Sequence, residues 1–173
     1  MRGTLAGPDH KLTGSKNEAV NVPFRSLKED HYMDAKRFVS GTLVGGVVLY
    51  VVGYLIFTMA FGPFYAANGG SATGVDRPAQ LMWAVALGNF AYAALIMFAA
   101  GNRMGSLSIG SGAQIGAIVG FLSWFTADFT LYGITNIANL TRTIVDPLLE
   151  IVHGGIGGGV MAVVLKSMTA PRR

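Results

Sequence analysis

Cysteine is absent from this chain of 173 residues, and charged residues are scarce. Without cysteine the chain can form no disulfide, no thiolate metal site and no cysteine nucleophile. Charged residues make up 13% of the chain and hydrophobic residues 51%, whereas a soluble domain carries about 25% charged residues. This shortage of charge excludes an ordinary soluble domain and predicts an integral membrane protein in contact with the lipid bilayer.

Recognisable enzyme signatures are missing as well. There is no phosphate-binding glycine loop and no Gly-x-Ser-x-Gly nucleophile elbow, and many glycines fall within apolar runs. Ser111 and Ser123 have no obvious base beside them. We therefore expect a protein without enzymatic activity. The net charge of +4 comes from the ends of the chain, so it predicts an orientation in a membrane and no nucleic-acid partner.

The apolar residues gather in four runs, each about long enough to cross a hydrocarbon core as a helix. The runs cover residues 38–61, 81–100, 109–131 and 144–165. They predict an all-α, polytopic membrane protein: a bundle of four transmembrane helices within residues 33–168. A polar tail (residues 1–32) precedes this domain and a basic tail (residues 169–173) follows it. Because the first 32 residues are polar, we expect the first run to be retained as a span rather than cleaved as a signal peptide.

The basic residues lie mostly on one side of the predicted membrane. Eleven of the 13 Lys and Arg residues lie before the first run, after the fourth run or in the link between the second and third runs, and only Arg77 and Arg142 lie on the other side. The positive-inside rule therefore predicts that both termini are cytoplasmic.

Glycines recur at four-residue spacing in three of the predicted spans, which places them on one face of each helix. They are Gly41 and Gly45, then Gly112, Gly116 and Gly120, then Gly154 and Gly158. In lipid such small-residue ridges let two helices approach closely. Two interpretations stay open: the ridges pack helices of the same chain, or one of them contacts a second copy or another membrane-protein subunit.

The fourth run carries most of the polar chemistry. Asp146, Glu150 and His153 are spaced i, i+4 and i+7, so they project from one face. The predicted topology brings Asp128 and Asn89 to the same outer half or near mid-depth. Because charged groups in hydrocarbon are costly, they normally face inward and find partners. These five residues are candidates for a ligand or proton site, and the alternative is a hydrogen-bond network that fixes the helix register.

Other roles for the same residues stay open. Asp146 follows Thr143 and precedes Pro147, as a residue that caps the fourth helix would. His153 could be the single axial ligand of a haem or a chlorophyll-type pigment, or form a zinc site with Glu150 and Asp128. The Glu-x-x-His motif at residues 150–153 lacks the second copy that a di-iron site needs. We expect no bound cofactor.

Two further patterns concern ancestry. Residues 40–62 and 111–133 align without gaps, since both open with Ser-Gly-x-x-x-Gly and both end with an aromatic residue and glycine. This leaves open a duplicated helical hairpin. The segments 116–122, 132–141 and 145–146, with Asp128 and the first-half segments 64–68 and 87–89, resemble an uncharacterised group of small four-span bacterial membrane proteins.

That resemblance covers about residues 33–166. It implies four helices in a bacterial inner membrane and no assigned activity, so no catalytic residue is carried over. It also implies a shared polar patch on the outer face, formed by Asp128, Asn136, Asn139 and Asp146.

The sequence leads to two hypotheses. The first is a non-enzymatic structural or accessory subunit of a homo-oligomer or a larger membrane complex, suggested by the glycine ridges. The second is a small transporter, channel or sensor whose outward-facing polar site is lined by Asn89, Asp128, Glu150 and His153.

Overall fold

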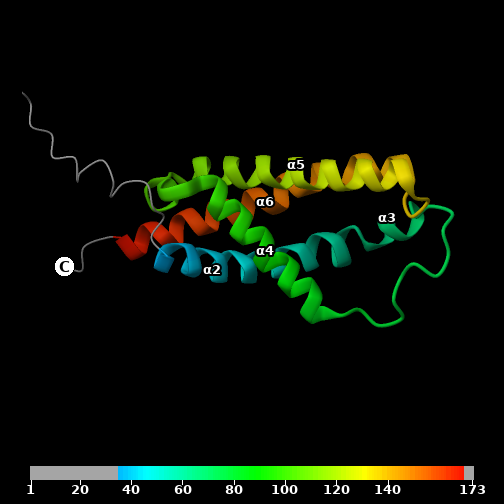
Figure 1. The fold of residues 1–173 in the computed structure, drawn as a ribbon, viewed down its shortest axis with the longest axis horizontal. Helices are drawn as coiled ribbons and strands as arrows, with labels where there is room; N and C mark the ends of the chain where they lie inside the picture. Colours follow the sequence, from blue (N-terminus) through cyan, green and yellow to red (C-terminus); the bar gives the residue numbers. More distant parts are fainter. Residues whose placement is uncertain (1–34, 170–173) are drawn as a thin grey trace, which may run out of the picture. The chain divides into compact units, whose positions relative to one another are not determined.

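A computed structural model of the chain describes residues 35–169, which lie within one compact unit, Tyr32–Arg173. In chain order its elements are α2 (Ala35–Gly53), the π-helix η1 (Tyr54–Ala60), α3 (Gly62–Ala67), α4 (Met82–Ala100), the 3₁₀-helix η2 (Gly101–Ser106), α5 (Ile109–Ile134) and α6 (Leu140–Thr169) (Figure 1). No β-strand occurs among these residues. The predicted tail 1–32 lies outside the described residues, as does the tail 169–173 apart from Thr169.

Four helical stretches are long and apolar enough to cross a membrane. They are Ala35–Ala60, Met82–Ser106, Ile109–Ile134 and Leu140–Met168. The prediction of an all-α chain with four spanning helices is therefore confirmed. The chain is an integral, multi-pass membrane protein, since apolar helices of this length need a bilayer around them.

The fourth helix begins four residues earlier than the apolar run suggested, because a polar residue caps it. The Arg142 backbone N–H donates to the Asn139 side-chain oxygen at 2.9 Å, and the Thr143 N–H donates to the Asn139 carbonyl at 3.1 Å. Asn139 thus satisfies amide groups of the first turn of α6, as an N-cap does. Asp146 lies inside α6, so it does not cap this helix.

The first span is not a uniform α-helix. From Tyr54 to Ala60 it widens into η1, and the Phe61 N–H donates to the Ile56 carbonyl, five residues back, at 2.8 Å. Hydropathy cannot reveal this change, because the segment keeps its apolar residues. π-Turns are rare and often occur near functional sites.

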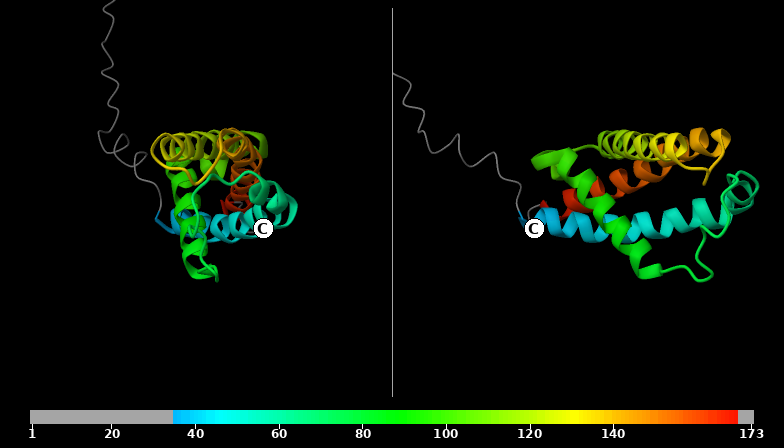
Figure 2. Two further views of the ribbon diagram at one scale, coloured as in Figure 1. Left: turned by 90° about the vertical axis from the view of Figure 1, so that its right-hand side faces the viewer. Right: turned by 45° about the vertical axis from the view of Figure 1, so that its right-hand side comes forward.

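The glycines of α5 and α6 bring these two helices into backbone contact. A Cβ atom added to Gly116 would overlap the Gly154 carbonyl oxygen, and one added to Gly158 would overlap the Gly112 carbonyl oxygen. Figures 1 and 2 show the two helices side by side along most of their length. Any side chain at these positions would force the helices apart.

The glycines of α2 are in contact with the same chain as well. A Cβ atom on Gly45 would overlap the Met161 side chain of α6, and one on Gly46 would overlap the Phe90 ring of α4. The glycines predicted as packing positions therefore lie at helix contacts within the chain. The prediction of a homo-oligomer or of partner subunits stays a prediction.

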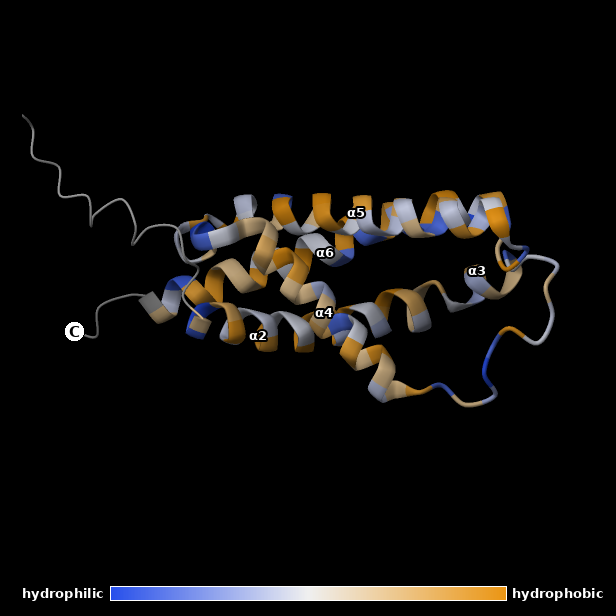
Figure 3. Cartoon of the chain, viewed as in Figure 1, coloured by the Kyte–Doolittle hydropathy of each residue, from blue (hydrophilic) through white to orange (hydrophobic). Residues whose placement is uncertain are grey.

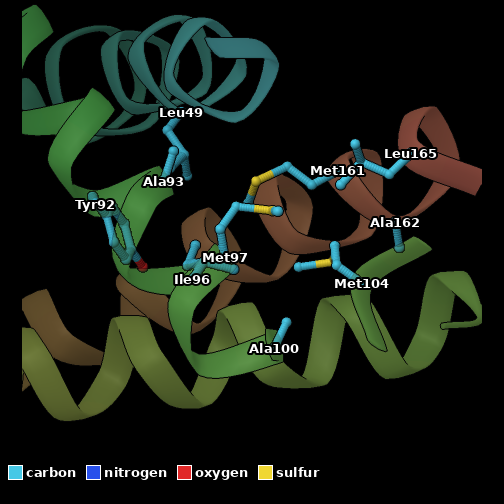
Figure 4. Close-up of a cluster of buried hydrophobic side chains, with 10 residues drawn as sticks. All are labelled: Leu49, Tyr92, Ala93, Ile96, Met97, Ala100, Met104, Met161, Ala162 and Leu165. Carbon is cyan, nitrogen blue, oxygen red and sulfur yellow. The ribbon is translucent and has the colours of Figure 1, made fainter. Parts of the chain in front are cut away.

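The bundle has two unlike halves. The half near η2 and the end of α6, called here the closed half, is filled by a cluster of buried side chains that point toward one another (Figure 4). The cluster consists of Leu49, Tyr92, Ala93, Ile96, Met97, Ala100, Met104, Met161, Ala162 and Leu165. In the other half α4 crosses the bundle obliquely, so that its first turns lie away from α5 (Figures 1 and 2).

Most residues along the spans are apolar, as the colouring in Figure 3 shows, and many large apolar side chains are exposed. On α2, for example, Val39, Leu43, Val47 and Val51 recur every four residues and are each half exposed. This stripe has the position and chemistry of a lipid-facing surface.

Candidate functional site

The centre of the site is a buried pair of polar side chains on α6. Glu150 and His153 are 1% and 3% exposed, and the His153 Nδ1 atom lies 2.9 Å from the Glu150 Oε2 atom. The other ring nitrogen, Nε2, lies 2.8 Å from the backbone carbonyl oxygen of Leu49 in α2. A Cβ atom at Gly53 would come within 3.2 Å of Nε2, so the glycine lets α2 approach the imidazole. His153 thus ties α6 to α2.

The Leu49 contact determines where the protons of the pair can be. A carbonyl oxygen only accepts, so Nε2 of His153 must carry a hydrogen and donate it. Nδ1 then accepts from a protonated Glu150, or donates to an ionised Glu150 as part of an imidazolium. In both states the pair holds one shared proton and has no net charge, which makes its burial in a membrane span tolerable.

Aromatic rings from three other elements enclose the imidazole. Phe57 of η1 and Tyr92 of α4 contact the His153 ring edge-to-face, with centroids 5.4 and 5.6 Å away. Trp124 of α5 packs against Tyr92 with its ring centroid at 5.2 Å. Each such contact adds about 0.5–1.5 kcal/mol beyond burial. Direct contacts from α2, η1 and α4 therefore hold His153 in place, and α5 supports the Tyr92 ring through Trp124.

The Tyr92 hydroxyl reaches into the α5–α6 contact. Cβ atoms on Gly120 and Gly154 would both overlap this oxygen, so the two glycines make room for it. The hydroxyl lies beside the Glu150 carboxyl, and it has no well-formed hydrogen bond among residues 35–169. It is a second polar group next to the shared proton.

A second polar cluster lies about one helical turn away on α6. Asp146 accepts a hydrogen bond from the Tyr65 hydroxyl of α3, and the Asp128 carboxyl of α5 lies beside Asp146. The Arg142 guanidinium lies over the Tyr65 ring, 5.0 Å from its centroid. Burial and the hydrogen bond to Asp146 raise the pKa of the Tyr65 hydroxyl above its ordinary value, so Tyr65 stays protonated and donates.

Backbone contacts between two links position Tyr65. The Gly70 N–H donates to the Ile137 carbonyl at 3.1 Å, and the Asn139 side chain donates to the Asn68 side chain at 3.1 Å. A Cβ atom on Gly70 would overlap the Asn136 carbonyl oxygen. These contacts fasten the chain after α3 to the link between α5 and α6. Two residues of the polar patch that the resemblance implies take part in these contacts, Asn139 through its side chain and Asn136 through its backbone carbonyl.

A cleft of about 1180 Å³ leads to the buried pair. It lies between η1 and α3, the first half of α4, and α6. Seven aromatic side chains line it: Tyr50, Tyr54, Phe57, Tyr65, Trp83, Tyr92 and Trp124. Its polar lining includes Asp146, Glu150 and His153. Of the buried side chains that fill the closed half, Tyr92 lines the cleft and the others, such as Met97 and Leu165, do not. The cleft therefore ends at Glu150 and His153.

The structure divides the five predicted site residues between two polar clusters and one separate position. Glu150 and His153 bond to each other, and Asp146 and Asp128 meet in the second cluster. Asn89 lines the cleft, but its side chain donates to the Val85 carbonyl of its own helix at 2.9 Å.

Sequence reasoning missed Tyr65, Tyr92, Phe57 and the Leu49 carbonyl as parts of the site. Tyr65 and Asn68 stand in a segment that carries the family resemblance, which is the one signal that pointed to them. The Leu49 carbonyl is a backbone group, so no residue type could reveal it.

Metal or pigment ligation by His153 does not fit this geometry without a change, because both ring nitrogens are in hydrogen bonds. Among residues 35–169 no group of three or more His, Cys, Asp or Glu side chains is arranged to hold a metal ion. Comparisons of the chain with protein-family models, curated proteins and solved structures find no match. Function must therefore be argued from the site itself.

Proposed function

We propose that this chain is a small ligand-binding membrane protein, a carrier or a sensor, whose binding site is the cleft that ends at Glu150 and His153. The observation that carries the proposal is the buried, proton-sharing pair at the floor of a cleft of about 1180 Å³. Small-molecule sites have this character: volumes of about 300–1000 Å³, mostly apolar walls and a few placed polar groups. The chain acts by binding rather than by enzymatic catalysis.

Binding at this floor is linked to protonation. Loss of the shared proton would leave a net negative charge on Glu150 and His153, and an uncompensated charge in a membrane span is costly. A ligand that alters the charge at the floor of the cleft therefore changes how tightly the proton is held. By linkage, the proton changes the affinity for the ligand by the same factor.

A one-ended cleft supports a carrier or sensor over an open channel, because buried apolar side chains fill the closed half. Our first hypothesis from the sequence, an accessory subunit, was suggested by the glycine ridges. Those glycines face helices of the same chain, so they no longer favour it. From the distribution of Lys and Arg we infer that the termini are cytoplasmic and that the cleft opens on the outer side of the membrane. The resemblance to small four-span bacterial proteins favours a bacterial inner membrane.

Intrinsic fluorescence tests this function, since the chain has two tryptophans and both line the cleft. With Trp83→Phe in place, Trp124 is the remaining reporter, and it packs on Tyr92 beside His153. In nanodiscs we expect the Trp124 emission to change reversibly with pH as Glu150 loses its proton.

Glu150→Gln is the critical variant. Glutamine can donate to Nδ1 and so keeps the hydrogen bonds of His153, but it cannot lose a proton. The pH response should disappear while thermal unfolding stays close to that of the parent. Arg103→Gln, a charge change at an exposed side chain outside the cleft, is the control and should leave the response intact. An equal response in all three proteins would refute the proposal.

A further inference from the structure

We propose that the cleft takes a lipophilic organic cation, such as an aromatic phosphonium or quaternary ammonium ion, in exchange for the proton shared by Glu150 and His153. This inference rests on the proposed function and names the ligand class of the same site.

The walls of the cleft are suited to a cation. Aromatic faces attract cations, and quaternary ammonium groups are commonly recognised by aromatic cages. One such contact already exists within the chain, because the Arg142 guanidinium lies over the Tyr65 ring. Tyr54 and Trp83, by contrast, line the cleft with exposed fractions of 48% and 68%, so their rings are accessible to a ligand.

The charges along the cleft favour a positive ligand over a negative one. On α6 the Arg142 cation compensates the Asp146 carboxylate electrostatically. The charge of Glu150 is compensated by the proton that it shares with His153. A cation that replaces this proton leaves the total charge unchanged. An anion would add negative charge beside two carboxyl groups, at a large cost in a poorly solvated site.

The groups that surround the pair come from every span. From α6 they are Asp146 and Arg142, and from α5 Asp128 beside Asp146. From α4 comes the Tyr92 hydroxyl, from α3 the Tyr65 hydroxyl, and from α2 the Leu49 carbonyl and the Tyr50 side chain. At the mouth, Asp76 and Arg77 are adjacent and oppositely charged. Among the described residues, Glu150 and His153 both line the cleft whereas Asp128 does not, so we assign the exchangeable proton to Glu150 and His153.

One wall of the access route is apolar. Leu81, just before α4, and Met82 and Val85 in its first turn line the cleft, and these side chains are 39–45% exposed. A ligand with an apolar body can therefore contact the cleft wall and lipid together. This is why we infer a lipophilic cation rather than a small hydrated one.

Tetraphenylphosphonium and tetraphenylborate are matched probes, because they have nearly the same size and shape and opposite charge. In nanodiscs, after subtraction of empty-nanodisc controls, we expect saturable phosphonium binding with one ion per chain and quenching of Trp124. The affinity should rise with pH by up to tenfold per unit, since one proton competes with one cation. Up to one proton should be released per ion bound, measured with a pH dye in weak buffer.

Two sets of variants separate the contribution of the exchangeable proton from the contribution of the aromatic wall. Glu150→Gln should weaken phosphonium binding at least tenfold and abolish both its pH dependence and the proton release. Tyr54→Leu should weaken binding about two- to fivefold with the pH dependence kept, while Tyr54→Phe, which retains the ring, should stay within twofold. Arg103→Gln, a charge change at an exposed side chain that does not line the cleft, should bind as the parent does. Because Tyr54 is not part of the Glu150–His153 pair, the Tyr54 variants still test cation binding if Glu150→Gln fails to fold.

The outcomes separate the ligand class from the function. If tetraphenylborate binds as tightly as the phosphonium, or if neither ion binds, the cation proposal is wrong, whereas the Glu150-dependent fluorescence response would leave the proposed function standing. If the phosphonium binds without proton release and equally well to Glu150→Gln, the exchange is refuted.

Discussion

Replacing Gly154 by alanine should separate α5 from α6 and strongly destabilise the protein. The added methyl group would overlap the Gly116 carbonyl oxygen and the Tyr92 hydroxyl. To restore ordinary contact, α5 would have to retreat by about 1 Å, and a gap of that size forfeits a quarter to a half of each van der Waals contact along the glycine seam. Overpacking typically costs about 1–3 kcal/mol. The obstacle here is backbone rather than a flexible side chain, so we expect the upper end, about 3 kcal/mol.

The neighbouring glycine provides the control. A methyl group at Gly155 would lie 3.6 Å from the Ala113 carbonyl oxygen, its nearest neighbour, which is ordinary contact. Gly155→Ala should therefore be neutral or slightly stabilising, since alanine is the better helix former. The free energies of unfolding of both variants can be measured by denaturant titration in mixed micelles. Equal losses of stability in the two would refute the steric reasoning.

Two further predictions concern the outer links. Tyr65→Phe removes the donor to Asp146 and should cost about 1–3 kcal/mol in unfolding free energy. Because the folded state raises the pKa of Tyr65 above its ordinary value of 10.0, this hydroxyl contributes no pH dependence below about pH 10, and above it stability falls as the unfolded state deprotonates. A pH series of unfolding should show that fall in the parent and a smaller fall in Tyr65→Phe; equal slopes would contradict the assignment. Gly70→Ala should clash with the Asn136 carbonyl oxygen, whereas a methyl group at Gly69 meets nothing within 4 Å. Limited proteolysis between α3 and α4 should accelerate in Gly70→Ala alone, and equal cleavage of Gly69→Ala would count against a fixed link.

The four spans were predictable because hydrophobicity accumulates over some twenty residues and needs no knowledge of neighbours. The ends of the helices were harder to predict from the sequence. The start of α6 depends on Asn139, whose cap adds a turn of polar residues that hydropathy assigns to a loop. The shared face of Asp146, Glu150 and His153 followed from helical periodicity alone.

The partners of these side chains were beyond such reasoning. Tyr65 bonds to Asp146 across 81 positions of the chain, and the Leu49 carbonyl bonds to His153 across 104. Contacts over such separations depend on how the helices cross, which no local pattern encodes. The same holds for Asn89, whose residue type suggested a site and whose side chain turned out to bond to its own helix.

The glycine seam between α5 and α6 has a mechanical consequence. Because α5 and α6 touch through their backbones, we expect these two helices to move together. Any opening or closing of the cleft must then be a displacement of the first hairpin, α2 with α4, against α5 and α6. The wide turns of η1 lie next to the His153 imidazole, which bonds α6 to α2. A hinge between the two helix pairs would need to be at this place.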